Sequence, residues 1–177
     1  MRLFVAAEVP EKIKERMGEL EAELPSEGLK KVNPLLMHIT LKFLGEVEDA
    51  KVPGVEAGLS SVEFAPFNVG VKGVGVFPSE SYVRVVWAGL EGEGLGTLAE
   101  KVEEALSGMF KREARGFSAH LTLARVRKKV ELGKFLEKHK DEAFGEFEVD
   151  RFVLMRSILK RPEPEYSVVA EFRAKFK

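Results

Sequence analysis

Hydrophobic residues recur along the chain at two spacings, which predict an alternation of strands and helices. Apolar residues that run together or alternate with polar ones are typical of strands, and those repeating every three or four positions are typical of helices. The predicted strands are residues 2–8, 37–44, 64–77, 82–90, 118–126, 144–159 and 166–176. The predicted helices are residues 10–24, 49–59, 95–110 and 130–140. A mixture of strands and helices in this order indicates an α+β fold.

One short pattern, His-x-Thr-Leu, occurs twice, at residues 38–41 and 120–123, and uses two of the three histidines. Each copy opens a predicted strand. Because alternate residues of a strand point to the same face, each histidine should project beside its threonine while the apolar residues face the core. A single His-x-Thr-x on a strand is commonly a packed or surface segment, and threonine is frequent in strands in any case. The repetition favours a functional pair.

The two motif strands occupy comparable places in the predicted order of elements, each with helices before and after it. We therefore expect one domain, residues 1–177, with a bilobal α+β fold. Two pseudo-symmetric lobes would each contain a mainly antiparallel sheet with outer helices. The motif strands would then face one another across an active-site groove between the lobes.

Paired imidazoles beside hydroxyls suit the hydrolysis of a phosphodiester. One imidazole can accept a proton from water while the other gives a proton to the departing oxygen, and the ordinary histidine pKa of about 6.5 allows both roles near neutrality. The hydroxyls of Thr40 and Thr122 can donate hydrogen bonds to the phosphate oxygens as negative charge develops there. Because the two motifs are chemically alike, the pattern alone leaves open which of His38 and His120 is the acid.

Composition narrows the range of functions. The chain has 28 Lys and Arg against 29 Asp and Glu, a net charge of -1, so a uniformly basic nucleic-acid coat is excluded while a local basic patch is not. There is no cysteine, hence no thiol nucleophile or zinc–thiolate site. No apolar run reaches the roughly 20 residues of a membrane span. We expect a cytoplasmic protein without membrane association, a monomer by default; the absence of glutamine and the presence of only two asparagines fit a heat-tolerant source.

The motifs, taken with other segments, resemble the two-histidine phosphoesterase superfamily, and within it the RNA 2',3'-cyclic phosphodiesterases, also called 2'-5' RNA ligases. The resemblance covers nearly the whole chain. The segments that carry it are residues 2–6 (Arg-Leu-Phe-Val-Ala), 38–47 (His-Ile-Thr-Leu-Lys-Phe-Leu-Gly-Glu-Val), 84–89 (Arg-Val-Val-Trp-Ala-Gly), 117–125 (Phe-Ser-Ala-His-Leu-Thr-Leu-Ala-Arg), 154–159 and Tyr166.

This resemblance implies a metal-independent hydrolase of RNA processing that opens a terminal 2',3'-cyclic phosphate to a 2'-phosphate. It assigns His38 as proton donor and His120 as proton acceptor. It also implies the reverse chemistry, in which a 5'-hydroxyl joins the cyclic phosphate in a 2'-5' linkage. The expected partners are RNA with a cyclic phosphate end, tRNA fragments among them, and nucleotides; neither cofactor nor metal is expected.

Four further residues are candidates for substrate contact. Phe43 and Arg125 each follow their motif histidine by five positions, where the family binds the nucleotide, so a base could stack on either. In a regular strand both would point away from the histidine face, so a twist or bulge is required. Lys42 shares the parity of His38 and could reach a phosphate. Arg84 lies in a family-like strand, where it would contact substrate or form an ion pair.

His139 lies between two lysines at a predicted helix end, where a solvated positive charge is expected.

Basic residues surround the second motif. The basic residues of this cluster are Lys111, Arg112, Arg115, Arg125, Arg127, Lys128 and Lys129. Arg156, Lys160 and Arg161, later in the sequence, could extend it. Such a cluster would attract an RNA backbone, whereas the run 127–129 taken alone is more typical of a solvated charged surface. Two alternatives stay open: a phosphodiesterase of small cyclic nucleotides or ADP-ribose cyclic phosphate, and a non-catalytic nucleotide- or RNA-binding module.

Overall fold

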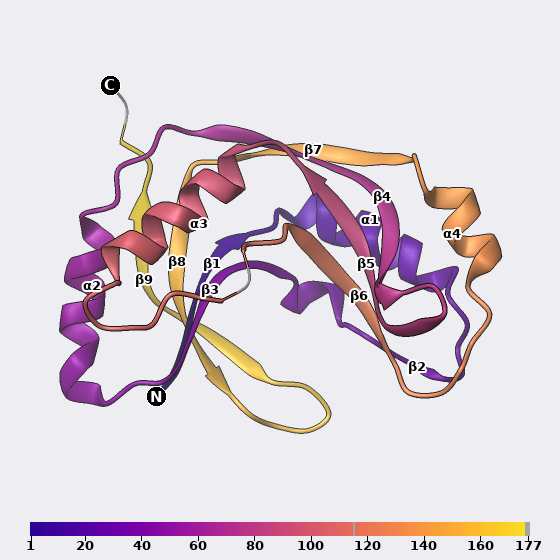
Figure 1. Ribbon diagram of the computed structural model, residues 1–177, viewed down its shortest axis with the longest axis horizontal. Coiled ribbons are helices and arrows are strands. Elements are labelled where there is room, and N and C mark those ends of the chain that lie inside the picture. The colour runs from indigo at the N-terminus through magenta and orange to yellow at the C-terminus, as the bar shows by residue number, and fades with distance from the viewer. Residues whose placement is uncertain (115, 176–177) are drawn as a thin grey trace.

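The strands of the protein form two antiparallel sheets (Figure 1). The computed structural model describes residues 1–114 and 116–175. The strands are β1 (Arg2–Glu8), β2 (Leu29–Lys31), β3 (His38–Glu46), β4 (Phe67–Ser79), β5 (Tyr82–Glu91), β6 (His120–Val126), β7 (Ala143–Val149), β8 (Arg151–Ile158) and β9 (Glu165–Arg173). One sheet has the order β3-β1-β8-β9 and the other β2-β6-β5-β4-β7. The motif strands β3 and β6 therefore belong to different sheets.

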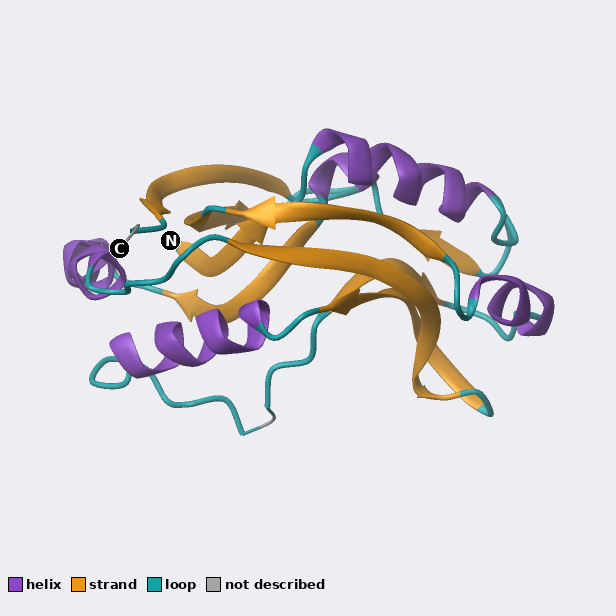
Figure 2. Cartoon of the chain, turned by 90° about the horizontal axis from the view of Figure 1, so that it is seen from above, coloured by secondary structure: helices purple, strands orange, loops and turns teal. Residues whose placement is uncertain are grey.

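Helices cover the outer faces of these sheets. They are α1 (Glu11–Ala22), α2 (Val52–Ser60), α3 (Gly94–Ala105) and α4 (Gly133–His139), with short 3-10 turns η1 (Pro34–Leu36) and η2 (Asp49–Lys51). Figure 2 shows the strands as a middle layer with α1 and α3 on opposite sides. The α3 helix packs on β3, and α1 packs on β6 and β7. The expected α+β architecture, with two antiparallel sheets and outer helices, is confirmed.

The helix α1 shows how the apolar pattern produces this arrangement. Pro10 precedes it with an extended backbone, and the chain turns into the helix without a side-chain cap. Ile13, Met17 and Leu20, spaced by four and three residues, are all buried against the neighbouring sheet. Each such side chain contributes about 1.5–3 kcal/mol by leaving water. These residues belong to one hydrophobic core that continues through both sheets.

Each lobe is assembled from distant parts of the chain. The first sheet combines β1 and β3 from the N-terminal part with β8 and β9 from the C-terminal part. The helix α1 follows β1 directly but packs on the other sheet. The chain thus crosses between the lobes several times, and both motif strands are held in place by contacts of high sequence separation.

Two expectations about strands were wrong. Residues 144–159 form two strands of different sheets, β7 and β8, because the chain passes from one sheet to the other at Asp150. The three-residue strand β2, which pairs with β6, was missed because its Leu-Lys-Lys sequence is short and mostly cationic. The predicted end of the last strand at Phe176 lies outside the described residues, and the last described strand, β9, ends at Arg173. Within the described residues, no helix is long and apolar enough to cross a membrane.

The expectation of a solvated His139 is also wrong, since its side chain is buried with 1% exposure. The ring lies between Phe135 and Phe144, and its Nδ1 is 3.0 Å from a carboxylate oxygen of Glu142. Phe135 precedes His139 by one helical turn on the inner face of α4, which explains the burial. His139 therefore helps to dock α4 in the core and lies apart from the motif strands.

Candidate functional site

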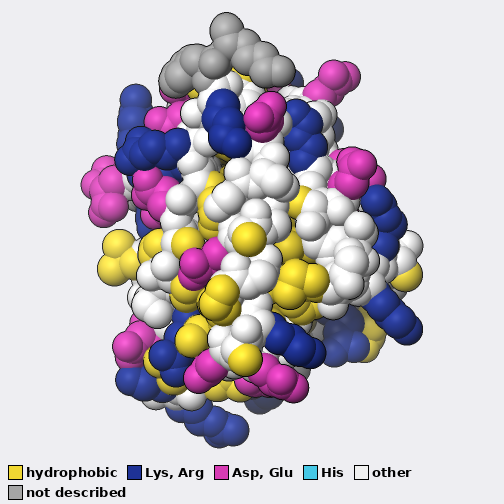
Figure 3. Space-filling model, turned by 90° about the vertical axis from the view of Figure 1, so that its left-hand side faces the viewer, with side chains coloured by type: hydrophobic (Ala, Val, Ile, Leu, Met, Phe, Trp, Pro, Cys, Tyr) yellow, Lys and Arg dark blue, Asp and Glu magenta, His cyan; other side chains and the backbone are white. Residues whose placement is uncertain are grey.

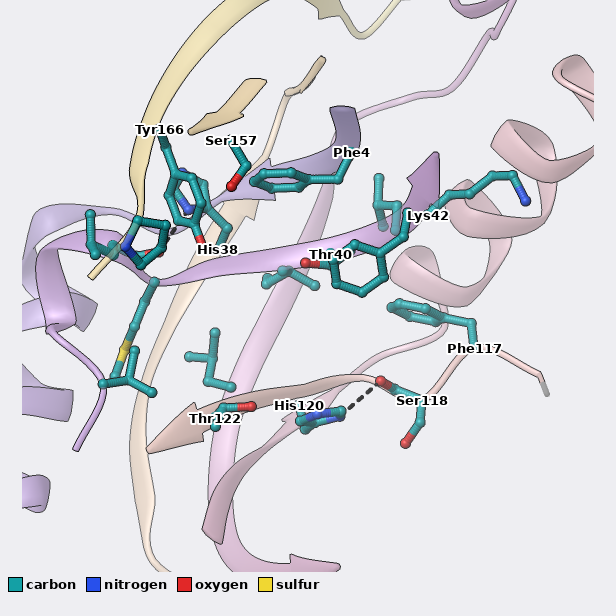
Figure 4. A pocket seen from close by; sticks show the side chains of 18 of the residues that line it. Phe4, His38, Thr40, Lys42, Phe117, Ser118, His120, Thr122, Ser157 and Tyr166 are labelled. Carbon is teal, nitrogen blue, oxygen red and sulfur yellow. Dashed lines mark hydrogen bonds between the residues drawn. The ribbon is translucent and has the colours of Figure 1, made fainter. Parts of the chain in front are cut away.

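The two motif histidines line the same groove, which has a volume of about 1230 Å³ (Figure 4). His38 and Thr40 project from β3, and His120 and Thr122 project from β6 on the opposite wall. All four side chains are partly exposed, whereas the intervening Ile and Leu residues are buried. The structure thus brings together the pairs that the repeated motif predicted.

Both motif strands contain an irregularity at the same motif position. In the pairing of β1 with β3, Ala6 faces Thr40 and Val5 faces Lys42, so Leu41 is skipped. In the pairing of β5 with β6, Trp87 faces Thr122 and Val86 faces Ala124, so Leu123 is skipped. Such a bulge inserts one extra residue and reverses the inward and outward alternation beyond it.

The matched bulges place Phe43 and Arg125 in the groove. Both side chains are exposed, Phe43 by 65%, and both line the groove beside the histidines. A bulge was the condition for either residue to share the face of its histidine, and it is present in both strands. Contact of these residues with a nucleotide stays a prediction.

Lys42 departs from its expected orientation. The bulge at Leu41 turns its side chain away from His38, and Figure 4 shows it directed toward α3. Its residue exposure is 2%, and its Nζ donates hydrogen bonds to both Glu103 carboxylate oxygens at 2.9 and 3.0 Å and to the Lys111 carbonyl at 2.9 Å. The expectation that Lys42 shares the parity of His38 is therefore wrong, and its ammonium is engaged in a buried ion pair.

Arg84 is also displaced from the site. Its side chain is exposed, and it is not among the residues that line the groove. The pairing of β4 with β5 shifts register between Phe77 and Pro78. Arg84, near the start of β5, therefore faces no residue of β4. Arg84 thus lies outside the groove that the two histidines line, and its contact with substrate stays a prediction.

The two imidazoles are held in the same way. His38 Nδ1 lies 2.8 Å from the Leu36 carbonyl oxygen, and His120 Nδ1 lies 3.0 Å from the Ser118 carbonyl oxygen. Since a carbonyl can only accept, each Nδ1 must carry the hydrogen. Each Nε2 is then left to accept a proton when its ring is neutral and to donate one when its ring is charged.

Burial lowers the pKa of both histidines. For His38, desolvation lowers the pKa, the Leu36 carbonyl raises it, Lys14 lowers it, and Glu8 raises it. For His120, desolvation again lowers the pKa, the Ser118 carbonyl raises it, and the Arg125 cation lowers it further. Among the described residues, the charged group that shifts the pKa of His120 is a cation, whereas His38 has one charge of each sign.

Aromatic rings support each histidine. Tyr166 packs edge-on against His38 with ring centroids 5.5 Å apart, and Phe77 packs edge-on against His120 at 5.1 Å. Phe4 and Trp87 complete the two enclosures at 6.2 and 6.4 Å. From the sequence, Tyr166 was predicted only as part of the closing hairpin, and none of these rings was assigned to the site. No periodicity marks them, because they reach the histidines from four other strands, β1, β9, β4 and β5.

The β8–β9 hairpin reaches from one lobe to the other at one end of the groove (Figure 1). Lys30 Nζ donates to the Pro162 carbonyl at 2.8 Å, and Asn33 Nδ2 donates to Glu163 Oε1 at 3.0 Å. Burial raises the pKa of Tyr166 on this hairpin, and the Arg125 cation on the opposite wall lowers it. The two walls are therefore close enough here to interact.

The predicted basic residues differ in whether they line the groove. The end at α2 shows cationic and anionic side chains interspersed (Figure 3). Within the basic cluster predicted from the sequence, Arg112, Arg125 and Arg127 line the groove, while Lys128 and Lys129 do not. Arg115 lies outside the described residues.

In residues 1–114 and 116–175, no three histidine, aspartate or glutamate side chains gather closely enough to hold a metal ion.

This fold and this groove define a bilobal α+β protein with a two-histidine site suited to acid–base chemistry. The family model of LigT-like phosphoesterases matches residues 3–87 and 90–166. The chain belongs to this family.

Two named relatives align with almost the whole length of this chain. A protein of Archaeoglobus fulgidus named RNA 2',3'-cyclic phosphodiesterase is 43% identical over 97% of this chain and 99% of its own length. A protein of the same name from Methanocaldococcus jannaschii is 35% identical over 97% of this chain and all of its own length.

Two solved structures extend the comparison to the fold. The crystal structure of TT0787 of Thermus thermophilus superposes with a TM-score of 0.83 at 32% identity, covering 98% of this chain and 97% of that one. The crystal structure of E. coli LigT complexed with 3'-AMP has a TM-score of 0.83 at 25% identity, covering 99% and 98% of the two chains.

Proposed function

We propose that this protein hydrolyses the 2',3'-cyclic phosphate at the end of an RNA strand and leaves a 2'-phosphate. The observation that carries this proposal is the pair of imidazoles on one groove, each with its Nδ1 bound to a backbone carbonyl and its Nε2 available. The names of the Archaeoglobus and Methanocaldococcus relatives support the substrate, and the 3'-AMP bound to E. coli LigT supports a nucleotide in the groove.

In the proposed reaction, the cyclic phosphate binds between the two walls. His120 Nε2 takes a proton from water as the water oxygen forms a bond to phosphorus. The bond between phosphorus and O3' breaks, and His38 Nε2 protonates O3' as it leaves. The phosphate remains on O2', so one water is consumed and no further reactant is required.

The charged neighbour of His120 supports this direction. The Arg125 cation lowers the pKa of His120 and so favours its neutral form, which a base needs. At His38, Lys14 lowers the pKa more than Glu8 raises it, so the distinction rests on His120.

The two threonines and the residues beyond the bulges complete the proposed site. Thr40 and Thr122 donate hydrogen bonds to the non-bridging oxygens as their charge grows. Phe43 offers an exposed ring on which a base can stack, and the Arg125 guanidinium offers a planar cation. The same groups would serve a joining reaction, in which a 5'-hydroxyl replaces water, attacks the cyclic phosphate and forms a 2'-5' linkage as O3' leaves.

The decisive experiment is product analysis. An oligonucleotide with a 2',3'-cyclic phosphate end is incubated with the protein in EDTA, and the hydroxyl that keeps the phosphate is then identified. We expect a 2'-phosphate, with kcat reduced about 10²–10⁴-fold in His38→Ala and in His120→Ala. Lys128→Gln, on an exposed side chain outside the groove, serves as the control. A 3'-phosphate product or undiminished turnover by His120→Ala would contradict the proposal.

The alternatives predict different substrate preferences. Faster turnover of a nucleoside 2',3'-cyclic phosphate or of ADP-ribose cyclic phosphate than of RNA ends would indicate a small-molecule phosphodiesterase. Oligonucleotide binding without any product would indicate a binding module.

A further inference from the structure

A like-charged pair lies where the groove meets the sheet edge. In the pairing of β2 with β6, Lys30 is directly opposite Arg125. Directly opposite residues of an antiparallel pair share a face, and the bulge at Leu123 has turned Arg125 to the groove face. Both side chains are exposed and both line the groove. Two cations so placed repel each other.

No carboxylate relieves this repulsion. Among residues 1–114 and 116–175, neither Lys30 nor Arg125 forms an ion pair, and the same holds for Arg127, the next groove-lining cation along the chain. The nearby carboxylate of Glu163 accepts from Asn33 instead. Lys30 gives one hydrogen bond to the Pro162 carbonyl, so two of its three N–H donors are left.

The cations continue the line of the motif strand. Because the bulge absorbs one residue, Arg125 lies two ladder positions beyond Thr122 on the groove side, and Arg127, just after the end of β6, also lines the groove. The distance across two ladder positions is about 6–7 Å. It matches the separation of successive phosphates in an extended nucleotide chain. A strand whose terminal phosphorus lies beside Thr122 would bring its preceding phosphates to Arg125 and Arg127.

The opposite end of the groove has the opposite character. Glu100, Glu103 and Glu113 line it there, on α3 and the segment after it. Arg112 is paired with Glu100 at 2.6 Å, and Glu103 is paired with Lys42 at 2.9 Å. Of the described cations there, Lys42 and Arg112 are thus already paired, and a phosphodiester backbone would gain little from them.

We infer that Lys30 and Arg127, on either side of Arg125, form a binding subsite for the phosphodiesters that precede the reacting nucleotide. The RNA strand then leaves the groove along β2 and β6, beside the β8–β9 hairpin. The inference rests on the proposed function for the identity of the terminal phosphate. It makes an oligonucleotide, rather than a mononucleotide, the substrate class that uses the whole groove.

Binding measurements with defined RNA ends test the subsite independently of turnover. The probes are an RNA tetranucleotide with a terminal 2'-phosphate and the matching nucleoside 2'-phosphate, each titrated at several salt concentrations. In a Lys30→Gln/Arg127→Gln double variant, the affinity for the tetranucleotide should fall about 10-fold or more, and the salt slope should fall by about 1.4, about 0.7 per lost cation on a single strand. The affinity for the mononucleotide should change less than about twofold, because no phosphate reaches these positions.

A matched double variant, Lys128→Gln/Lys129→Gln, removes two cations of the same segment that do not line the groove. It should leave both affinities nearly unchanged. Equal losses for the two probes, or equal losses in the two double variants, would overturn the subsite. Tetranucleotide binding that depends on Lys30 and Arg127, without turnover of a cyclic end, would refute the proposed function and leave the subsite standing. Turnover of a cyclic end, combined with equal losses of affinity for the two probes, would support the proposed function and refute the subsite.

Discussion

Lys42 of β3 and Glu103 of α3 form a buried ion pair, with the ammonium 2.9 and 3.0 Å from the two carboxylate oxygens. A third hydrogen bond, to the Lys111 carbonyl, connects the pair to the segment that leads toward His120. The pair therefore links the first motif strand, the helix on its outer face and the approach to the second motif.

Replacing one partner of the Lys42–Glu103 pair should lower the free energy of unfolding more than replacing both partners. Lys42→Met leaves Glu103 without its cation in a largely buried place, and we expect a loss of about 3–5 kcal/mol in the free energy of unfolding. The double variant Lys42→Met/Glu103→Leu should lose less than Lys42→Met alone. Denaturant unfolding of the two singles and the double gives the coupling. Arg112→Gln, which breaks an exposed pair, is the control and should change little. Additive losses in the double variant would contradict this account.

The pH dependence of kcat/KM should be bell-shaped, with its centre below about 6.5, the ordinary histidine pKa. The base His120 is active when neutral, so the rate falls as the pH drops below its pKa. The acid His38 is active when charged, so the rate falls as the pH rises above its pKa. Burial lowers both pKa values and moves both limbs to lower pH. Initial rates on a nucleoside 2',3'-cyclic phosphate across the pH range give the two limbs.

Arg125→Gln should shift one limb selectively. Because the Arg125 cation lowers the pKa of His120, its removal should move the acid limb to higher pH and leave the alkaline limb in place. Lys129→Gln provides the charge-matched control. A profile centred above pH 7, or a shift of both limbs, would argue against the assigned roles.

The threonine hydroxyls should matter for turnover far more than for folding. Thr40→Val and Thr122→Val keep the shape of the side chain and remove its donor, so we expect kcat to fall about 10²-fold in each. The corresponding serine variants retain a hydroxyl and should recover most of the rate. Equal kcat values for the valine and serine variants would show that the hydroxyl has no role in the transition state.

Glu21 on α1 should make the protein less stable at alkaline pH. Burial raises its pKa to about 7, which Lys31 only partly opposes. The folded state therefore holds this proton to higher pH than the unfolded chain, and stability falls as the pH rises from about 4.5 to about 7. Glu21→Gln should add roughly 1–3 kcal/mol at pH 8 and little at pH 4. Denaturant unfolding at both pH values, with the exposed Glu15→Gln as control, measures this; an equal effect at the two pH values would refute it.

The positions of Phe43 and Arg125 show the limit of a pattern read along one strand. The repeated motif was sufficient to predict that His38 and His120 share a groove, because residue types and alternation determine the face of each strand. The bulges at Leu41 and Leu123 arise from pairing with β1 and β5, which are distant in sequence. The alternation of residues within one strand gives no information about its pairing with other strands. The sequence pattern therefore placed Lys42 on the wrong face.

The remaining errors have similar causes. The apolar pattern continues across Asp150, so the passage from one sheet to the other left no signal in it. His139 did leave a signal, since it follows the apolar Phe135 by one helical turn, but the adjacent lysines favoured a solvated end. The family resemblance predicted the fold more completely than periodicity did, because it draws on the whole order of segments.

The identical anchoring of the two rings to backbone carbonyls has a consequence for successive catalytic cycles. If His38 gives up its hydrogen and His120 gains one, each hydrolysis leaves the pair in the mirror image of its starting charge state. That image is the state required for the opposite reaction, so a product held in place could simply be closed again. Forward cycling then requires both imidazoles to re-equilibrate with bulk solvent before the next cyclic phosphate binds, whether the attacking hydroxyl comes from water or from a 5' end.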